Sequence, residues 1–233
     1  MYRSKQGRVR LKARVSAAKL GEYLAAPAHR RERIIHDQKY LSPFIVARYT
    51  RANNAIRASL LGGGDVSGRL LSKASLIEND VATSSFQAEV NQGSAHAVRS
   101  FAKLVPALPL NGVTFAMTGT QSFYSRVEGV EISAAPVVLL QRTKRDGSTE
   151  VGALMTVMTK QVKLSDHSGR AVAELLRQAL LDAGYTNVRP RLCLIVDVFA
   201  GTVFYAPSAR KRLSSEIASA CREIAVRWPA IAA

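Results

Sequence analysis

The alternation of hydrophobic and polar positions predicts a series of strands and helices in the second half of the chain. Apolar residues recur at helical spacing over 92–104, 165–184 and 208–228, which predicts three helices. Ser165 is an N-cap and Gly184 a stop signal for the middle helix. Short apolar or alternating runs predict the strands, which cover 113–120, 127–133, 137–140, 150–158, 192–199 and 202–205. The order predicts an α/β (α+β) fold with a mixed central sheet of αβββαβ type flanked by helices.

The first 61 residues predict a basic, mainly helical region. Residues 8–15 alternate cationic with apolar side chains, so that a strand there would place its cations along one edge. Helices are predicted after Ser16, over 29–39 and from Pro43 to about residue 60. Residues 62–91, which open with three consecutive glycines, predict a linker or irregular segment. Residues 92–233 form the predicted α/β core with its C-terminal helix.

Positive charge is concentrated in this N-terminal region. The whole chain has 33 Lys and Arg against 17 Asp and Glu, a net charge of +16, and residues 1–60 have 14 against 3, which is +11. Such an excess favours a polyanionic partner, because each neutralised phosphate releases condensed counterions. The cations expected to bind nucleic acid are Arg8, Arg10, Lys12, Arg14, Arg30, Arg31, Arg33, Arg48, Arg51 and Arg57. The alternative is structural: charges that protect an edge strand and the solvated faces of amphipathic helices.

Composition also bears on where the protein acts. No apolar run approaches the roughly 18 residues that a membrane-spanning helix needs. The first residues lack the apolar core of a secretory signal, although their arginine content leaves an organelle transit peptide as an alternative. Cys193 and Cys221 fall inside a predicted strand and helix, which suits a reducing compartment. We therefore expect a cytoplasmic protein with no membrane association.

The αβββαβ order over residues 92–199 resembles the catalytic core of the PD-(D/E)xK nuclease superfamily. In that family the second strand opens with Pro-Asp and the third carries Glu/Asp-x-Lys, and the carboxylates hold Mg²⁺. Here Pro136 is followed by Val137, and Met158 stands two residues before Lys160. Neither an isopropyl group nor a thioether is a ligand for Mg²⁺. The resemblance therefore implies a nuclease-like fold whose metal site has decayed.

These observations leave three functional hypotheses. The first is a nucleic-acid-binding protein, with DNA preferred to RNA, that is catalytically degenerate, needs no cofactor and belongs to a mobile-element, phage or defence system. The second is an active Mg²⁺-dependent nuclease that uses Lys160 with Glu131 and Glu89, because some family members carry an extra acid near the first core helix. The third is a basic adaptor that binds an acidic protein. The sequence predicts no metal ligands beyond these and leaves enzymatic activity open.

Overall fold

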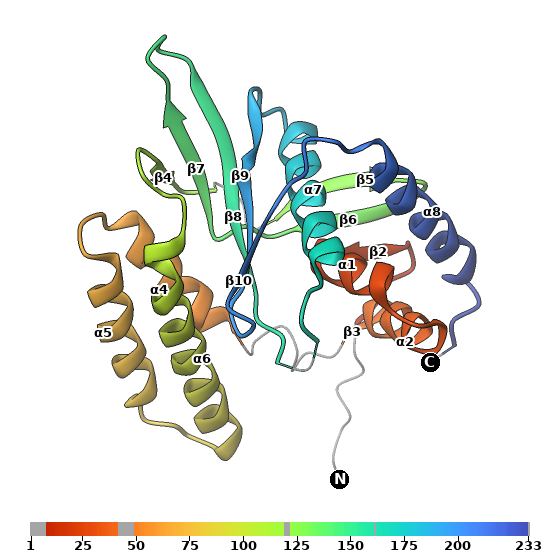
Figure 1. Cartoon of the computed structure of the whole chain (residues 1–233). Coiled ribbons are helices and arrows are strands. Elements are labelled where there is room, and N and C mark those ends of the chain that lie inside the picture. The colour runs from red at the N-terminus through yellow and green to blue at the C-terminus, as the bar shows by residue number, and fades with distance from the viewer. Residues whose placement is uncertain (1–7, 42–48, 119–121, 161, 233) are drawn as a thin grey trace.

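A computed structural model describes residues 8–41, 49–118, 122–160 and 162–232 and shows an α/β protein built on a mixed five-stranded sheet (Figure 1). The strand order is β10-β9-β8-β7-β4, with β8 and β9 parallel and the other neighbours antiparallel. The strands are β4 (Thr114–Ala116), β7 (Val138–Thr143), β8 (Thr149–Val157), β9 (Val188–Asp197) and β10 (Thr202–Tyr205). The α/β class expected from the sequence is confirmed.

Helices cover both faces of this sheet because its central strands alternate between two cores. Leu140 and Leu154 pack against α4 (Thr50–Leu61), α5 (Val66–Glu78) and α6 (Ser85–Leu104), which is followed by the 3-10 turn η1 (Val105–Ala107). Leu139 and Met155 face the opposite way, toward α7 (Asp166–Asp182). Figure 1 shows the three helices on one side of the sheet and α7 on the other. Strands buried on both faces explain why β7, β8 and β9 read as nearly continuous apolar runs.

A three-stranded sheet lies beyond α7, in the order β2-β6-β5. The strand β2 (Arg14–Ser16) runs parallel to β6 (Val130–Ala134), which is antiparallel to β5 (Phe123–Val127). The predicted strand over 127–133 is therefore wrong, because Glu128 and Gly129, with φ of 47° and 78°, form a two-residue turn. The β5–β6 hairpin lies between β4 and β7 in the chain but on the other sheet, so residues 127–133 are not the first strand of the expected αβββαβ unit. The order along the five-stranded sheet is instead α6, β4, β7, β8, α7 and β9.

The N-terminal segment is part of both layers. Its helices α1 (Ala17–Ala25) and α2 (Ala28–Lys39) share a core with α7 and α8 (Lys211–Arg227), whereas α4 packs on the five-stranded sheet. The single strand expected over residues 8–15 is wrong. Two short strands replace it: β1 (Arg8–Val9) pairs with β3 (Tyr40–Leu41), and β2 pairs with β6.

The irregular segment expected over residues 62–91 is also wrong, because it holds α5 and the first turns of α6. The Asp65 side chain caps α5 by accepting a hydrogen bond from the Gly68 amide at 2.9 Å. Its buried residues follow helical spacing at Leu70, Ala74 and Ile77, but the exposed leucines in the same helix obscure that pattern in the sequence. None of the helices within the described residues is long and apolar enough to cross a bilayer.

Candidate nucleic-acid interface

The outer face of the three-stranded sheet carries the candidate site. Phe123 and Ile132 point into the core, and strand alternation therefore sends their neighbours Tyr124, Arg126 and Glu131 outward. The Cα register places Glu131 between Arg126 of β5 and the β2 residue Arg14. Side chains that are far apart in the sequence thus form one continuous surface.

This surface borders a groove of about 720 Å³, which we call the basic groove. Among the described residues, four cations line it, Arg10, Lys12, Arg14 and Arg126, and Glu131 is the one lining carboxylate. The lining charges therefore sum to +3. Three of the four cations come from the N-terminal segment that the sequence pattern singled out, and the fourth comes from β5.

The four cations differ in how firmly they are held. The Arg10 guanidinium donates to the backbone carbonyls of Arg14 and Gln38, each at 3.3 Å. The Arg14 guanidinium pairs with the Glu131 carboxylate at 3.2 Å and donates to the Tyr124 hydroxyl at 2.9 Å. It also lies 4.7 Å from the centroid of the Tyr124 ring.

Lys12 and Arg126 are different, because both are exposed and neither has an ion pair or side-chain hydrogen bond within the described residues. Exposed, uncommitted cations can pair with a phosphate without first breaking an internal contact. These two side chains are therefore the groups in the groove that are most available to an anion.

Arg30, Arg31 and Arg33, predicted on α2, do not line the groove. Arg30 donates to the Glu22 carboxylate at 2.6 Å, and Arg31 donates to the Ala26 carbonyl at 3.0 Å. Arg33 is exposed and lines a separate pocket beside α2. The α2 cations thus hold the helix in place or face solvent elsewhere.

The cations predicted on α4 stabilise the helical layer. Arg51 contacts the Asp80 carboxylate and donates to Asn91, while Arg57 donates to the Val137 carbonyl at 2.9 Å. Arg48 lies outside the described residues. Arg8 belongs to β1 through its backbone, and its side chain is not described.

The three residues predicted to be catalytic do not converge. Glu89 and Lys160 line one pocket of about 440 Å³, together with Tyr49 and His96, beside α6 and beyond the end of β8. Glu131 instead lines the basic groove on the other sheet, where it pairs with Arg14. Across the described parts of the chain, no three His, Cys, Asp or Glu side chains are grouped so that they could hold a metal ion.

The strands β7 and β8 are neighbours even though Glu89, Glu131 and Lys160 are dispersed. The Val137 amide donates to the Leu154 carbonyl at 2.7 Å, so the start of β7 lies beside the last residues of β8. Met158 packs against the apolar core on the α4–α6 side. The position therefore offers apolar side chains where carboxylates would be required.

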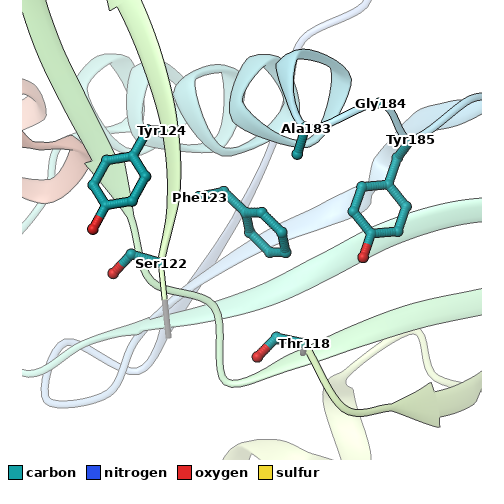
Figure 2. Close-up of a pocket in the computed structure, with 7 residues that line it drawn as sticks. All are labelled: Thr118, Ser122, Phe123, Tyr124, Ala183, Gly184 and Tyr185. Carbon is teal, nitrogen blue, oxygen red and sulfur yellow. The ribbon is translucent and has the colours of Figure 1, made fainter. Parts of the chain in front are cut away.

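Sequence reasoning missed an aromatic pocket that adjoins the outer face of the sheet (Figure 2). Phe123 and Tyr124 of β5 line it with Tyr185, which follows α7, and the Phe123 and Tyr185 rings meet edge to face with centroids 5.7 Å apart. Tyr124 is 45% exposed. The alternation of residues 123–127 could have revealed an outward aromatic residue, but only the fold shows its partner.

No protein-family model matches this chain, and no curated protein is significantly similar to it.

Proposed function

We propose that this protein binds nucleic acid, DNA in preference to RNA, through the basic groove. The observation that carries the proposal is the convergence of Arg10, Lys12, Arg14 and Arg126 on one groove with a single opposing carboxylate. A groove with a net charge of +3 concentrates positive potential where a phosphate backbone would lie. Guanidinium groups also match the geometry of phosphate oxygens, which they can bind with two parallel hydrogen bonds.

We further propose that the αβββαβ unit is a PD-(D/E)xK-like fold that binds without cleaving. Two features support this. Val137 and Met158 occupy the positions where the family places carboxylates, and Glu131 lies with Arg14 rather than with Lys160. A cytoplasmic role in a mobile-element, phage or defence system suits such a protein.

The active-nuclease alternative rests on Glu89 and Lys160, which do line one pocket. A single carboxylate beside a lysine supplies little of the oxygen-rich coordination that Mg²⁺ requires. The adaptor alternative rests on charge alone, since an acidic protein would also be attracted to the groove. Regular spacing of phosphates distinguishes the two partners, because only a polyelectrolyte gives a steep, linear dependence of log affinity on log salt concentration.

The test is the salt dependence of binding to a dye-labelled thymidine oligomer, measured by fluorescence anisotropy. With the Arg14 charge balanced by Glu131, three other cations line the groove, and each single-strand phosphate contact contributes about 0.7 to the slope. We therefore expect a slope near −2, or about a 20-fold loss of affinity between about 50 and 200 mM salt. The double variant Lys12→Ala/Arg126→Ala should keep one of these contacts, so that the loss of affinity over the same salt range falls to about 3-fold.

The matched control is Lys103→Ala, which removes an exposed cation on α6, a helix that Figure 1 shows on the other side of the five-stranded sheet from β2 and β5. It should bind as the parent protein does. Equal losses in the control and the groove variant, or binding without salt dependence, would overturn the proposal. Incubation of the parent protein with plasmid in Mg²⁺ or Mn²⁺ should give no cleavage. Metal-dependent cleavage that disappears in Lys160→Ala would favour the nuclease alternative instead.

A further inference from the structure

We infer that the pocket beside the basic groove receives an unpaired nucleobase, so that the ligand of this site is single-stranded nucleic acid. This inference rests on the proposed function and specifies its ligand. The pocket has a volume of about 660 Å³, within the range typical of small-ligand sites. Figure 2 shows seven described residues that line it: Thr118 and Ser122 on either side of residues 119–121, Phe123 and Tyr124 in β5, and Ala183, Gly184 and Tyr185 directly after α7.

The chemistry of the pocket suits a planar, neutral group. In a protein of net charge +16, none of the seven lining residues is charged, so a phosphate would find no counter-ion there. Tyr185 is partly exposed and Tyr124 is 45% exposed, so these two residues supply the accessible aromatic surface, whereas the Phe123 ring is buried in the core. Aromatic rings stack on bases with little regard to base identity, because every base has a π-face.

The end of α7 adds a second reason to expect a base rather than a phosphate. Ala183 and Gly184 line the pocket immediately after the last residue of that helix. A helix C-terminus carries the negative end of the helix dipole, which repels anions and attracts hydrogen-bond donors. The amino and imino groups of bases are such donors, whereas phosphate oxygens only accept.

Tyr124 joins this pocket to the basic groove. Tyr124 is one of the residues that line the pocket, and its hydroxyl accepts a hydrogen bond from Arg14, which lines the groove. Arg126 lies two residues further along the same face of β5, about 7 Å away at the rise of an extended strand. A nucleic-acid strand whose phosphates contact Arg126 could therefore place a neighbouring base against Tyr124.

This arrangement discriminates against a duplex. Bases inside a duplex are stacked and paired, so one of them must be extruded before it can enter a lateral pocket. A single strand presents its bases without that cost, and single-strand readers commonly combine a cationic path with aromatic stacking platforms. Stacking on one ring typically strengthens binding by about 5- to 150-fold per base.

The experiment compares a thymidine oligomer with an abasic oligomer of the same length, which has the same phosphates but no bases. We expect the parent protein to bind the thymidine oligomer at least about 5-fold more tightly, by anisotropy in competition format. The Tyr124→Leu and Tyr185→Leu variants should lose this preference while keeping the slope against salt. Tyr124→Phe keeps the ring and should keep the preference. Phe86→Leu, which changes an exposed aromatic residue on α6, is the control.

The outcomes separate this inference from the proposed function. Equal affinity for the two oligomers with a steep salt slope would overturn the base pocket but leave phosphate binding intact. Failure to bind either oligomer would overturn both. Comparison of a uridine oligomer with a deoxyuridine oligomer, which differ only in the sugar, identifies the preferred sugar, and a base preference with either sugar supports the inference. Thermal denaturation followed by circular dichroism confirms that the leucine variants remain folded.

Discussion

Replacing Glu131 with glutamine should strengthen nucleic-acid binding. The Glu131 carboxylate is the one acidic group that lines the basic groove, and it pairs with the Arg14 guanidinium at 3.2 Å. Glutamine preserves the side-chain length and the backbone pairing with β2, but it removes the charge. The lining charges rise from +3 to +4, and Arg14 becomes available to a phosphate. A catalytic role for Glu131 predicts instead that the same substitution abolishes cleavage.

The size of the effect follows from the exposure of the pair. The Arg14 and Glu131 side chains are 33% and 36% exposed, so solvent screens their attraction and limits it to about 0–1 kcal/mol. We therefore expect affinity to increase by up to about 5-fold at low salt. One additional phosphate contact should steepen the slope by about 0.7, so that the loss between about 50 and 200 mM salt grows from about 20-fold to about 50-fold.

The assay is anisotropy with a thymidine oligomer across that salt range, with Glu128→Gln as the matched control. Glu128 lies in the same hairpin and also pairs with an arginine, Arg222, at 2.9 Å, but it does not line the groove. Its substitution should leave the slope unchanged. Weaker binding by Glu131→Gln, or equal gains from both substitutions, would refute the assignment of Glu131 as the counter-charge of the groove.

Two further predictions concern stability. Gly152→Ala should lower the free energy of unfolding by about 1–3 kcal/mol in urea titrations, because a Cβ there would lie 2.2 Å from the Leu192 carbonyl oxygen. The control is Thr149→Ala on the exposed end of β8, which should lower it by less than about 1 kcal/mol. Burial raises the pKa of Glu22, but hydrogen bonds from Lys19 and Arg30 outweigh it and hold that pKa below its ordinary value of 4.5. Because the pKa is lower in the folded state, the ionised carboxylate stabilises the fold at pH values above the pKa of the unfolded state. Glu22→Gln should therefore lower the free energy of unfolding by about 1–3 kcal/mol near pH 7, and the gap in stability between the two proteins should narrow as pH falls below 4.5. A gap that widens in acid would contradict this account.

The sequence predicted the elements whose signals are local. The cap at Ser165 and the helical spacing that follows it define α7, and the long apolar runs define β8 and β9, whose side chains are buried on both faces. The sequence predicts a single strand over 127–133 because the turn residues Glu128 and Gly129 fit an alternating pattern as well as a turn. Periodicity alone cannot report the left-handed backbone that separates the two interpretations.

The candidate site was predictable only in part, because its geometry depends on distant pairing. The cations of residues 10–14 were evident from the alternation, but Tyr124 lies 110 positions from Arg14 in the sequence. Their contact arises from the parallel pairing of β2 with β6, which no local pattern specifies. Dependence on distant pairing also explains why the sequence suggests a catalytic role for Glu131. The sequence indicates that Glu131 lies on a strand, but it does not show that the neighbouring side chain is Arg14.

The way in which the N-terminal segment is anchored bears on how the groove would bind. Its strand β2 is fixed to β6 by backbone pairing, and α1 packs so closely on α7 that a Cβ at Gly21 would lie 2.3 Å from Val172 Cγ2. Arg10, Arg14 and Tyr124 are further restrained by hydrogen bonds. Binding therefore need not order the groove's backbone or most of its side chains, which removes one of the main entropic costs of association. A preorganised groove of modest charge can thus hold a strand with few contacts, and a single stacked base becomes a large share of the affinity.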